Sequence, residues 1–246
     1  MTEKLNIIYE DNHIIVVEKQ AGILTQGDYS GEISLLDLVK SYIKKQYNKP
    51  GEAFAGLVHR LDKSVSGVLV FARTSKAAAR LQKEFQRGDI KKFYIAITET
   101  RENMPNQRGW ITLSNHILRV GDKTIVETKE SPHTEKALLQ YKIIKSNKEF
   151  SLLLINLITG KKHQIRAQLA SAGFPIVGDK KYGSTISEKS GICLHAIFLS
   201  LLHPTKKERI SFYCHPPAVF NKFFEIDNLS LKEEIKKHIE EILEEK

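Results

Sequence analysis

Residues 59–72 read HRLDKSVSGVLVFA. The first half is polar and charged, and the second half, residues 66–72, is an apolar run that predicts a buried strand. Asp62 stands in the polar half between Arg60 and Lys63. Functional residues concentrate on loops that a rigid element holds in place. A carboxylate beside fixed cations stays ionised, which suits a nucleophile or a base. The alternative is a structural ion pair in a turn.

The segments on either side of this stretch predict one α+β domain. Helical and strand periodicities alternate, and no repeat or Pro/Gly/Ser-rich linker divides them. Strand patterns cover residues 6–10, 13–19, 92–98, most of 110–158, 194–202 and 209–213, and helical patterns cover 34–47, 75–87 and 163–172. Ser75 is the expected N-cap of the second helix. We expect residues 99–108 to form a long loop.

Residues 225–246 form a separate pattern at the C-terminus. Ser230 and Glu233 have the spacing of a capping box, which predicts that a helix begins there. Apolar residues repeat on one face of this helix, at Leu231, Ile235, Ile239 and Ile242. We therefore expect an amphipathic helix that packs on, or extends from, a domain formed by residues 1–224.

The charge of the chain indicates a polyanionic partner. The chain carries 38 Lys and Arg against 29 Asp and Glu, a net charge of +9. Residues 225–246 hold eight acids and four lysines, so residues 1–224 hold 34 basic and 21 acidic residues, or +13. A body this basic favours nucleic acid first and an anionic membrane second. Solubility alone is the other explanation of such a charge.

Several classes of protein are disfavoured by the composition. No apolar run approaches the roughly 20 residues of a membrane helix, and no signal peptide stands at the start. Two cysteines are too few for a disulfide framework. The Cys and His residues near the end match no metal-binding spacing, so we expect no metal site; they are Cys193, His195, His203, Cys214 and His215. We expect a cytoplasmic protein with no membrane association.

Two further clusters favour contact with phosphate and bases. Residues 159–166, TGKKHQIR, lie between a predicted strand and a predicted helix. Helix N-termini with nearby cations attract phosphate, and Arg166 could reach a carboxylate of another loop. Residues 91–96, KKFYIA, set basic residues beside an aromatic ring, as in RNA-binding surfaces. An exposed basic turn and a core-facing Tyr94 are the respective alternatives.

These clusters together resemble the RluA-type RNA pseudouridine synthases. The loop HRLD at 59–62, followed by Ser-Gly at 66–67, is similar to the catalytic motif of that family. Tyr94 in its Lys-x-Tyr setting and TGKKHQIR at 159–166 resemble the second and third motifs. The match spans roughly residues 6–216 and includes IIVVEKQAG, GFPIVGD, LHA and His-Pro segments that are similar to other family motifs. Gln20 and Val65 depart from the usual pattern.

The resemblance implies a fold and a reaction. It implies a catalytic domain with a mixed, largely antiparallel central sheet flanked by helices and loops. The chain resembles the shorter members, which lack an N-terminal RNA-binding module. The reaction converts a uridine of RNA to pseudouridine, with no net change of atoms or oxidation state, so no cofactor is implied. Ribosomal RNA, transfer RNA or both are the implied partners, and no obligatory protein partner is expected.

The resemblance also assigns roles to residues. Asp62 corresponds to the essential carboxylate, which attacks the ribose or the uracil or acts as a base. Arg166 would pair with Asp62, and Tyr94 would stack on the uracil and could assist proton transfer from carbon 5. Ile165 and Leu194 would line the uracil site with apolar surface.

The remaining expected contacts are with RNA. The target uridine must be flipped out of a paired or stacked strand. Arg60 would fill the space that the base leaves, and His59 would brace the loop. Lys161 and His163 would contact RNA near Arg166.

The sequence is also compatible with three alternative functions. The first is a catalytically inactive RNA-binding protein of the same fold. The second is an unrelated hydrolase that uses Asp62 with His163 or His195. The third is a metal-dependent nucleic-acid enzyme, which usually needs clustered acids.

Overall fold

A computed structural model describes residues 5–100, 109–225 and 227–244 of the chain. The strands are β1 (Asn6–Glu10), β2 (Ile14–Lys19), β3 (Gly56–Leu57), β4 (Ser66–Ala72), β5 (Lys91–Glu99), β6 (Ile111–Val120), β7 (Lys123–Glu127), β8 (Glu135–Ser146), β9 (Phe150–Leu157), β10 (Leu194–Leu202) and β11 (Arg209–Tyr213). The helices are α1 (Leu35–Gln46), α2 (Ser75–Arg87), α3 (Gln164–Ser171) and α4 (Asn228–Glu244), with 3-10 turns η1 (Lys180–Tyr182) and η2 (Ala218–Lys222).

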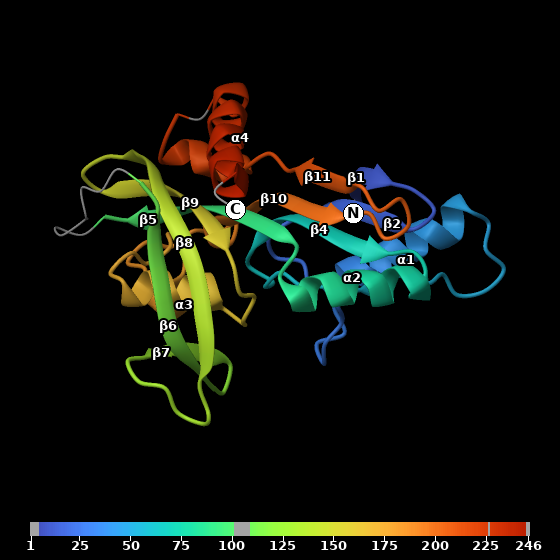
Figure 1. The fold of residues 1–246 in the computed structure, drawn as a ribbon, viewed down its shortest axis with the longest axis horizontal. Helices are drawn as coiled ribbons and strands as arrows, with labels where there is room; N and C mark the ends of the chain where they lie inside the picture. Colours follow the sequence, from blue (N-terminus) through green and yellow to red (C-terminus); the bar gives the residue numbers. More distant parts are fainter. Residues whose placement is uncertain (1–4, 101–108, 226, 245–246) are drawn as a thin grey trace.

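The described strands form one sheet in the order β1-β2-β4-β10-β5-β9-β8-β6-β7, with β3 beside β4 and β11 beside β10. Every pair of described strands is antiparallel except β4 with β10. In Figure 1, α1 and α2 lie below the sheet and α4 lies above it. The α+β class and the mixed, largely antiparallel sheet expected from the sequence are therefore confirmed.

One edge of β10 changes its partner strand along its length, and this change positions the polar loop before β4 that carries Asp62. One edge of β10 pairs with β4 at His195 and Ala196 and then with β11 from Phe198 onward. The contact between β4 and β10 requires a glycine at position 67. The φ of Gly67 is +128°, and a Cβ there would lie 2.4 Å from the backbone N and O of Ala196. Tyr94 of β5 pairs with the same Ala196 from the other side. The loop before β4 and the middle of β5 are thereby brought together at β10.

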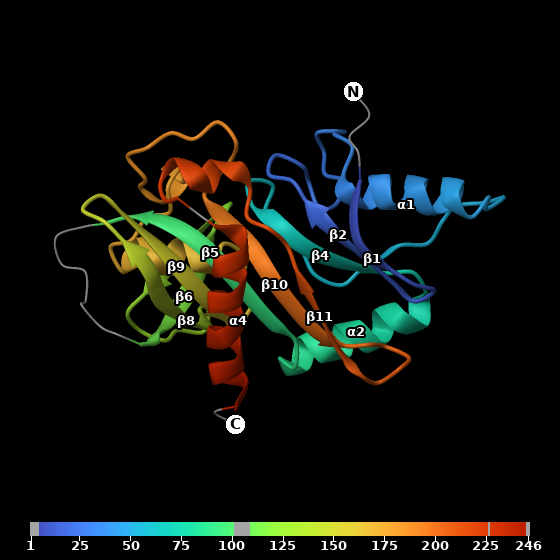
Figure 2. The same cartoon turned by 90° about the horizontal axis from the view of Figure 1, so that it is seen from above.

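The C-terminal helix buries its apolar face against the core, as expected from its pattern. Leu231, Ile235 and Ile239 are at most 4% exposed. Figure 2 shows α4 lying across the face of the sheet. The side chain of Ile242 lies outside the described residues, and the domain boundary predicted at residue 225 stays a prediction.

Two predicted helix caps are wrong. The carboxylate of Asp227, rather than Ser230, accepts hydrogen bonds from the first turn of α4, from Leu229 N at 3.3 Å and Ser230 N at 3.2 Å. The helix therefore begins earlier than predicted, and its cap is Asp227, two residues before Leu229, rather than Ser230. Helix α2 is capped by Thr74, whose hydroxyl accepts from Ala77 N at 3.1 Å, so the threonine adjacent to Ser75 takes this place.

The loop predicted for residues 99–108 and the absence of a membrane helix are the two remaining expectations. Strand β5 runs through Glu99, so the loop predicted for residues 99–108 begins later, and residues 101–108 lie outside the described part of the chain. None of the helices in the described ranges combines the length and the apolar character needed to cross a membrane.

Candidate active site

The backbone fixes the loop that carries Asp62. Val65 N donates to Asp62 O at 3.0 Å and closes a turn. The hydroxyl of Thr25 donates to Leu61 O at 2.7 Å and accepts from Leu61 N at 3.3 Å. Thr25 is 4% exposed, so this pair of hydrogen bonds is shielded from water. The loop therefore holds Asp62 by main-chain contacts, which leaves its carboxylate free to face other groups.

Lys19 lies beneath the same loop and fixes its second half. Its ammonium donates to Val65 O at 2.7 Å and to Lys63 O at 3.1 Å, and its side chain is fully buried. Burial lowers the pKa of Lys19 to about 7, although the charge of Asp62 acts in the opposite direction. Lys19 belongs to the segment IIVVEKQAG that resembles a family motif, and no role was predicted for it from the sequence.

Arg166 brings the third sequence cluster to Asp62. Its Nη1 donates to Asp62 Oδ2 at 3.0 Å, although 104 residues separate the two. Its Nε and Nη2 donate to Asp179 Oδ2 and Oδ1 at 2.7 and 2.9 Å. The bidentate pair with Asp179 fixes the plane of the guanidinium, so that the remaining nitrogen points at Asp62.

The charges around Arg166 keep it protonated. Burial alone would lower the pKa of Arg166, but the hydrogen bonds and charges of Asp179 and Asp62 outweigh burial and raise it. The ring of Tyr182 lies 4.9 Å from the guanidinium carbon and covers one side of it. Asp179 and Tyr182 were not predicted as site residues; the only signal was that Asp179 ends the GFPIVGD motif.

His163 forms a second contact with Asp62. It is the N-cap residue of α3 with a left-handed φ of +53°, and its Nε2 lies 3.6 Å from Asp62 Oδ2. The hydroxyl of Tyr182 accepts from Thr124 N at 2.8 Å and lies 3.0 Å from His163 Nδ1. Burial lowers the pKa of His163. We therefore assign the neutral tautomer in which Tyr182 donates to Nδ1 and the Nε2–H faces Asp62.

One oxygen of Asp62 stays open. Both side-chain contacts described above use Oδ2, and no hydrogen bond from a described residue reaches Oδ1. The side chain is 27% exposed. An aimed carboxylate with one free, accessible oxygen can attack or deprotonate a bound molecule.

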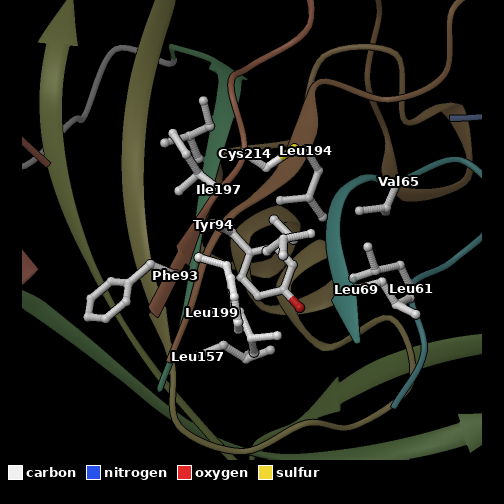
Figure 3. Close-up of a cluster of buried hydrophobic side chains, with 14 of the residues drawn as sticks. Leu61, Val65, Leu69, Phe93, Tyr94, Leu157, Leu194, Ile197, Leu199 and Cys214 are labelled. Atoms are coloured by element: carbon white, nitrogen blue, oxygen red, sulfur yellow. The ribbon is translucent and has the colours of Figure 1, made fainter. Parts of the chain in front are cut away.

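Apolar side chains surround Tyr94 beside this carboxylate. Figure 3 shows the ring of Tyr94 within a cluster that includes Leu61, Val65 and Leu194, with the hydroxyl pointing toward Leu61 and Leu69. Tyr94, Leu194 and Ile165 are all buried, with exposed fractions of 7%, 3% and 5%. Burial, followed by the charge of Asp62, raises the pKa of Tyr94, so its hydroxyl is a phenol at neutral pH.

Arg60 and Lys161 lie outside this network. Arg60 is exposed, and it has no hydrogen bond or ion pair with another described residue. Lys161 pairs with Glu135. The structure thus brings Asp62, Arg166, His163 and Tyr94 together and leaves these two cations at its margin.

His195 and His203 belong to the scaffold. His195 is fully buried, with Nδ1 2.9 Å from Ser66 Oγ and Nε2 3.1 Å from Cys214 O. His203 Nε2 lies 2.7 Å from Asp11 Oδ2 in the turn between β1 and β2. The hydrolase alternative that pairs Asp62 with His195 therefore fails. Within the described ranges, no group of three His, Cys, Asp or Glu side chains has the geometry of a metal site.

Comparisons with known proteins give one consistent result. Residues 13–171 match the family model of RNA pseudouridylate synthases. YhcT of Bacillus subtilis, described as an uncharacterized RNA pseudouridine synthase, is 33% identical over 210 residues, which cover 84% of this chain and 67% of that protein. Ribosomal large subunit pseudouridine synthase C of Buchnera aphidicola is 31% identical over 207 residues, 81% of this chain and 63% of that protein.

A solved structure agrees with these matches. The human protein RNA Pseudouridylate Synthase Domain Containing 4 superposes with a TM-score of 0.72 at 26% sequence identity. The superposition covers 87% of this chain and 90% of the human one. The similarity therefore extends over the sheet and the site rather than over one motif.

Proposed function

Because the chain belongs to the RNA pseudouridylate synthase family, we propose that it isomerises a flipped-out uridine of ribosomal RNA with Asp62 as the reacting carboxylate, either as nucleophile or as base. The family match confirms the resemblance and the enzyme class, an isomerase that acts on RNA. The observation that carries the role of Asp62 is its geometry. Arg166 holds Oδ2 at 3.0 Å, and Oδ1 is open to a ligand.

The reaction balances within the RNA itself. The bond between N1 of uracil and C1′ of ribose breaks, and a bond between C5 and C1′ forms. The C5 proton leaves, and N1 takes one up. Asp62 takes part by attacking the ribose or the uracil, or as a base at the sugar, and each route needs an ionised and oriented carboxylate. The paired guanidinium of Arg166 supports both requirements.

Tyr94, Ile165 and Leu194 provide the surface for the uracil. All three side chains are apolar or aromatic and enclosed. Tyr94 and Leu194 lie in one cluster with Leu61 and Val65 of the Asp62 loop, and Ile165 directly precedes Arg166. Base stacking on an aromatic ring stabilises a flipped nucleotide by about 1–3 kcal/mol. The raised pKa of Tyr94 keeps its hydroxyl protonated in the RNA-free protein, so the phenolate that could accept a proton is scarcely populated there. Proton transfer from C5 to Tyr94 would therefore require that the hydroxyl first lose its own proton.

Arg60, Lys161 and His163 are assigned to RNA contacts around the flipped base. Flipping costs a few kcal/mol of lost stacking and pairing. Arg60 is exposed two residues from Asp62, and its planar guanidinium can stack in the vacated position. Lys161 stands before α3 near the carboxylate and is assigned to the backbone of the same nucleotide. His163 faces Asp62 through Nε2, and we assign it to the part of the nucleotide that lies against Asp62.

Ribosomal RNA is the substrate class that the relatives favour. Relatives at 28–31% identity are named ribosomal large subunit pseudouridine synthases C and D. Transfer RNA remains the second expected pool. A ribosomal substrate agrees with the cytoplasmic location expected from the sequence, which stays a prediction.

Tritium release tests this proposal. Bulk ribosomal RNA and transfer RNA lacking pseudouridine, labelled at uridine C5, are incubated with wild type, Asp62→Ala and the control Asp28→Ala. Asp28 is an exposed carboxylate whose described hydrogen bonds involve Ser30 alone. We expect release from ribosomal RNA by wild type and Asp28→Ala and none by Asp62→Ala. Release by Asp62→Ala overturns the mechanism, and release from transfer RNA alone overturns the substrate. RNA binding without release by wild type favours an inactive RNA-binding protein.

A further inference from the structure

Lys92 is a partly buried cation between the two loops that carry Asp62 and Arg166. It lies two residues before Tyr94 on β5, so both side chains share one face of the sheet. Its Nζ lies 3.2 Å from the position that a Cβ would take at Gly160. Burial together with the charge of Lys92 lowers the pKa of His59 to about 3. The ammonium therefore lies beside Gly160, and its charge acts on His59.

This ammonium has no counter-charge in the described part of the chain. No described carboxylate lies within ion-pair distance of Lys92, and no hydrogen bond from it is present. Two other lysines near the site are paired, Lys63 with Glu32 and Lys161 with Glu135. Burial lowers the pKa of Lys92. Removing a cation from water without a partner costs free energy, so the fold alone gives no reason for the charge.

The loop beside Lys92 carries no side chain where it meets the ammonium. Gly160 lies against the Lys92 ammonium, and any Cβ there would crowd it. The loop around it is fixed, since Thr159 N donates to Leu138 O at 3.0 Å and the Thr159 hydroxyl donates to Gln164 Oε1 at 2.8 Å. A rigid loop with a glycine beside an unpaired cation is an arrangement that accepts an anion.

We propose that Lys92 binds a backbone phosphate of the RNA adjacent to the flipped uridine. This rests on the proposed function, because that function supplies the polyanion and places the uridine at Asp62. Residues 1–224 carry +13, so a polyanion is the expected partner of this surface. Arg60, also unpaired within the described residues, follows His59 directly and extends the same cationic strip. A partly buried cation interacts with phosphate more strongly than a surface lysine does, because water screens it less.

Salt dependence of RNA binding distinguishes this role from a packing role. Lys92→Met keeps the length of the side chain and removes the charge, and Lys92→Arg keeps the charge. Lys83→Met on α2 is the matched control, since Lys83 is exposed and has no ion pair with a described residue. The dissociation constant for an unmodified transcript of large-subunit ribosomal RNA is measured at several salt concentrations, and the melting temperature is measured without RNA.

One lost phosphate contact lowers the slope of log K against log salt by about 0.7–0.9. We expect this decrease for Lys92→Met, none for Lys83→Met, and a slope close to wild type for Lys92→Arg. The melting temperature of Lys92→Met should equal or exceed that of wild type, because an uncompensated charge has been removed. An unchanged slope overturns the proposal. A marked fall in melting temperature also overturns it, since the lysine would then be structural.

Tritium release by the same samples separates this proposal from the previous one. Release by wild type with an unchanged Lys92→Met slope means that the phosphate site is absent and the isomerase function stands. A reduced slope without any release by wild type means that Lys92 contacts RNA although the proposed isomerisation fails.

Discussion

Two polar clusters flank the contact between β4 and β10, and they differ in how completely their hydrogen bonds are satisfied. His195 is fully buried, and both ring nitrogens have partners in Ser66 and Cys214. The side chain of Asp62 is 27% exposed, and among the described residues only Oδ2 has side-chain partners. Both residues belong to motifs that resemble one family. We therefore expect the reacting group where a carboxylate oxygen lacks a hydrogen-bond partner beside fixed cations, and we assign buried side chains with all partners present to the scaffold.

The cluster around His203 has the same character as that around His195. Its Nδ1 accepts from Thr205 N at 3.2 Å and Lys206 N at 2.9 Å, while Nε2 contacts Asp11. Asp11 also accepts from the backbone of the β1–β2 turn, and these hydrogen bonds outweigh burial and lower its pKa to about 2. This motif residue therefore ties the end of β10 to the first hairpin.

Among the residues that support Asp62, Arg166→Ala is expected to have the largest effect on both the isomerisation rate and the free energy of unfolding, because Arg166 contacts both the partly exposed Asp62 and the buried Asp179. Loss of the contact with Asp62 should lower the rate of isomerisation by about 10²–10³-fold. Asp179 is 2% exposed and would keep a buried charge without a partner, which costs about 3–5 kcal/mol of unfolding free energy. Single-turnover rates and urea unfolding measure the two effects. A stable variant with full activity would contradict this assignment.

Asp179→Asn tests whether Asp179 acts by positioning the guanidinium of Arg166. The amide keeps the volume and one acceptor, but it loses the bidentate charge pair that orients Arg166. We expect kcat to fall by about 10–100-fold with little change in KM, since misorientation of a reacting group affects the rate rather than binding. A change in KM alone would show that Asp179 acts on RNA binding instead. Lys180→Ala, an exposed neighbour, is the control.

The closed cluster predicts a pH dependence of stability. Burial lowers the pKa of His195 to about 4, from an ordinary value of 6.5. Between these values the unfolded chain binds a proton that folded His195 does not bind, so stability is complete above pH 6.5 and is lost as the pH falls toward 4. From pH 7 to pH 5 this amounts to about 2 kcal/mol.

Urea unfolding of wild type and His195→Asn at pH 7 and pH 5 tests this prediction. The variant should be less stable at pH 7 and should lose less stability between the two pH values. Equal losses in the two proteins would mean that other groups, such as His59 with its lowered pKa, account for the change.

Lys161→Met should have the smallest effect. Its ammonium pairs with an exposed Glu135, and surface ion pairs contribute about 0–1 kcal/mol. We expect an unchanged melting temperature, an unchanged single-turnover rate at saturating RNA, and weaker RNA binding at low salt. A loss of rate at saturation would move Lys161 from the margin of the site to its centre.

The sequence predicted the strands and the contact between Asp62 and Arg166 better than it predicted the residues that support them. The periodicity of residues 66–72 and the HRLD and HQIR motifs are local signals, and they located Asp62 and Arg166. Asp179, Tyr182 and Lys19 act through contacts that only the folded chain creates, such as the three-way arrangement of Asp62, Arg166 and Asp179. The N-cap of α2 was predicted wrongly for a similar reason. Thr74 and Ser75 carry equivalent hydroxyls, and only the folded backbone determines which of them caps the helix.

The most direct test compares Asp62→Ala with His195→Asn in the same assay. Tritium release from C5-labelled ribosomal RNA is measured at a temperature at which both variants are folded, and each rate is normalised to folded protein. We expect Asp62→Ala to release no tritium and His195→Asn to release it at nearly the wild-type rate. Activity of Asp62→Ala, or an equal loss in folded His195→Asn, would contradict the distinction between the open and the closed cluster.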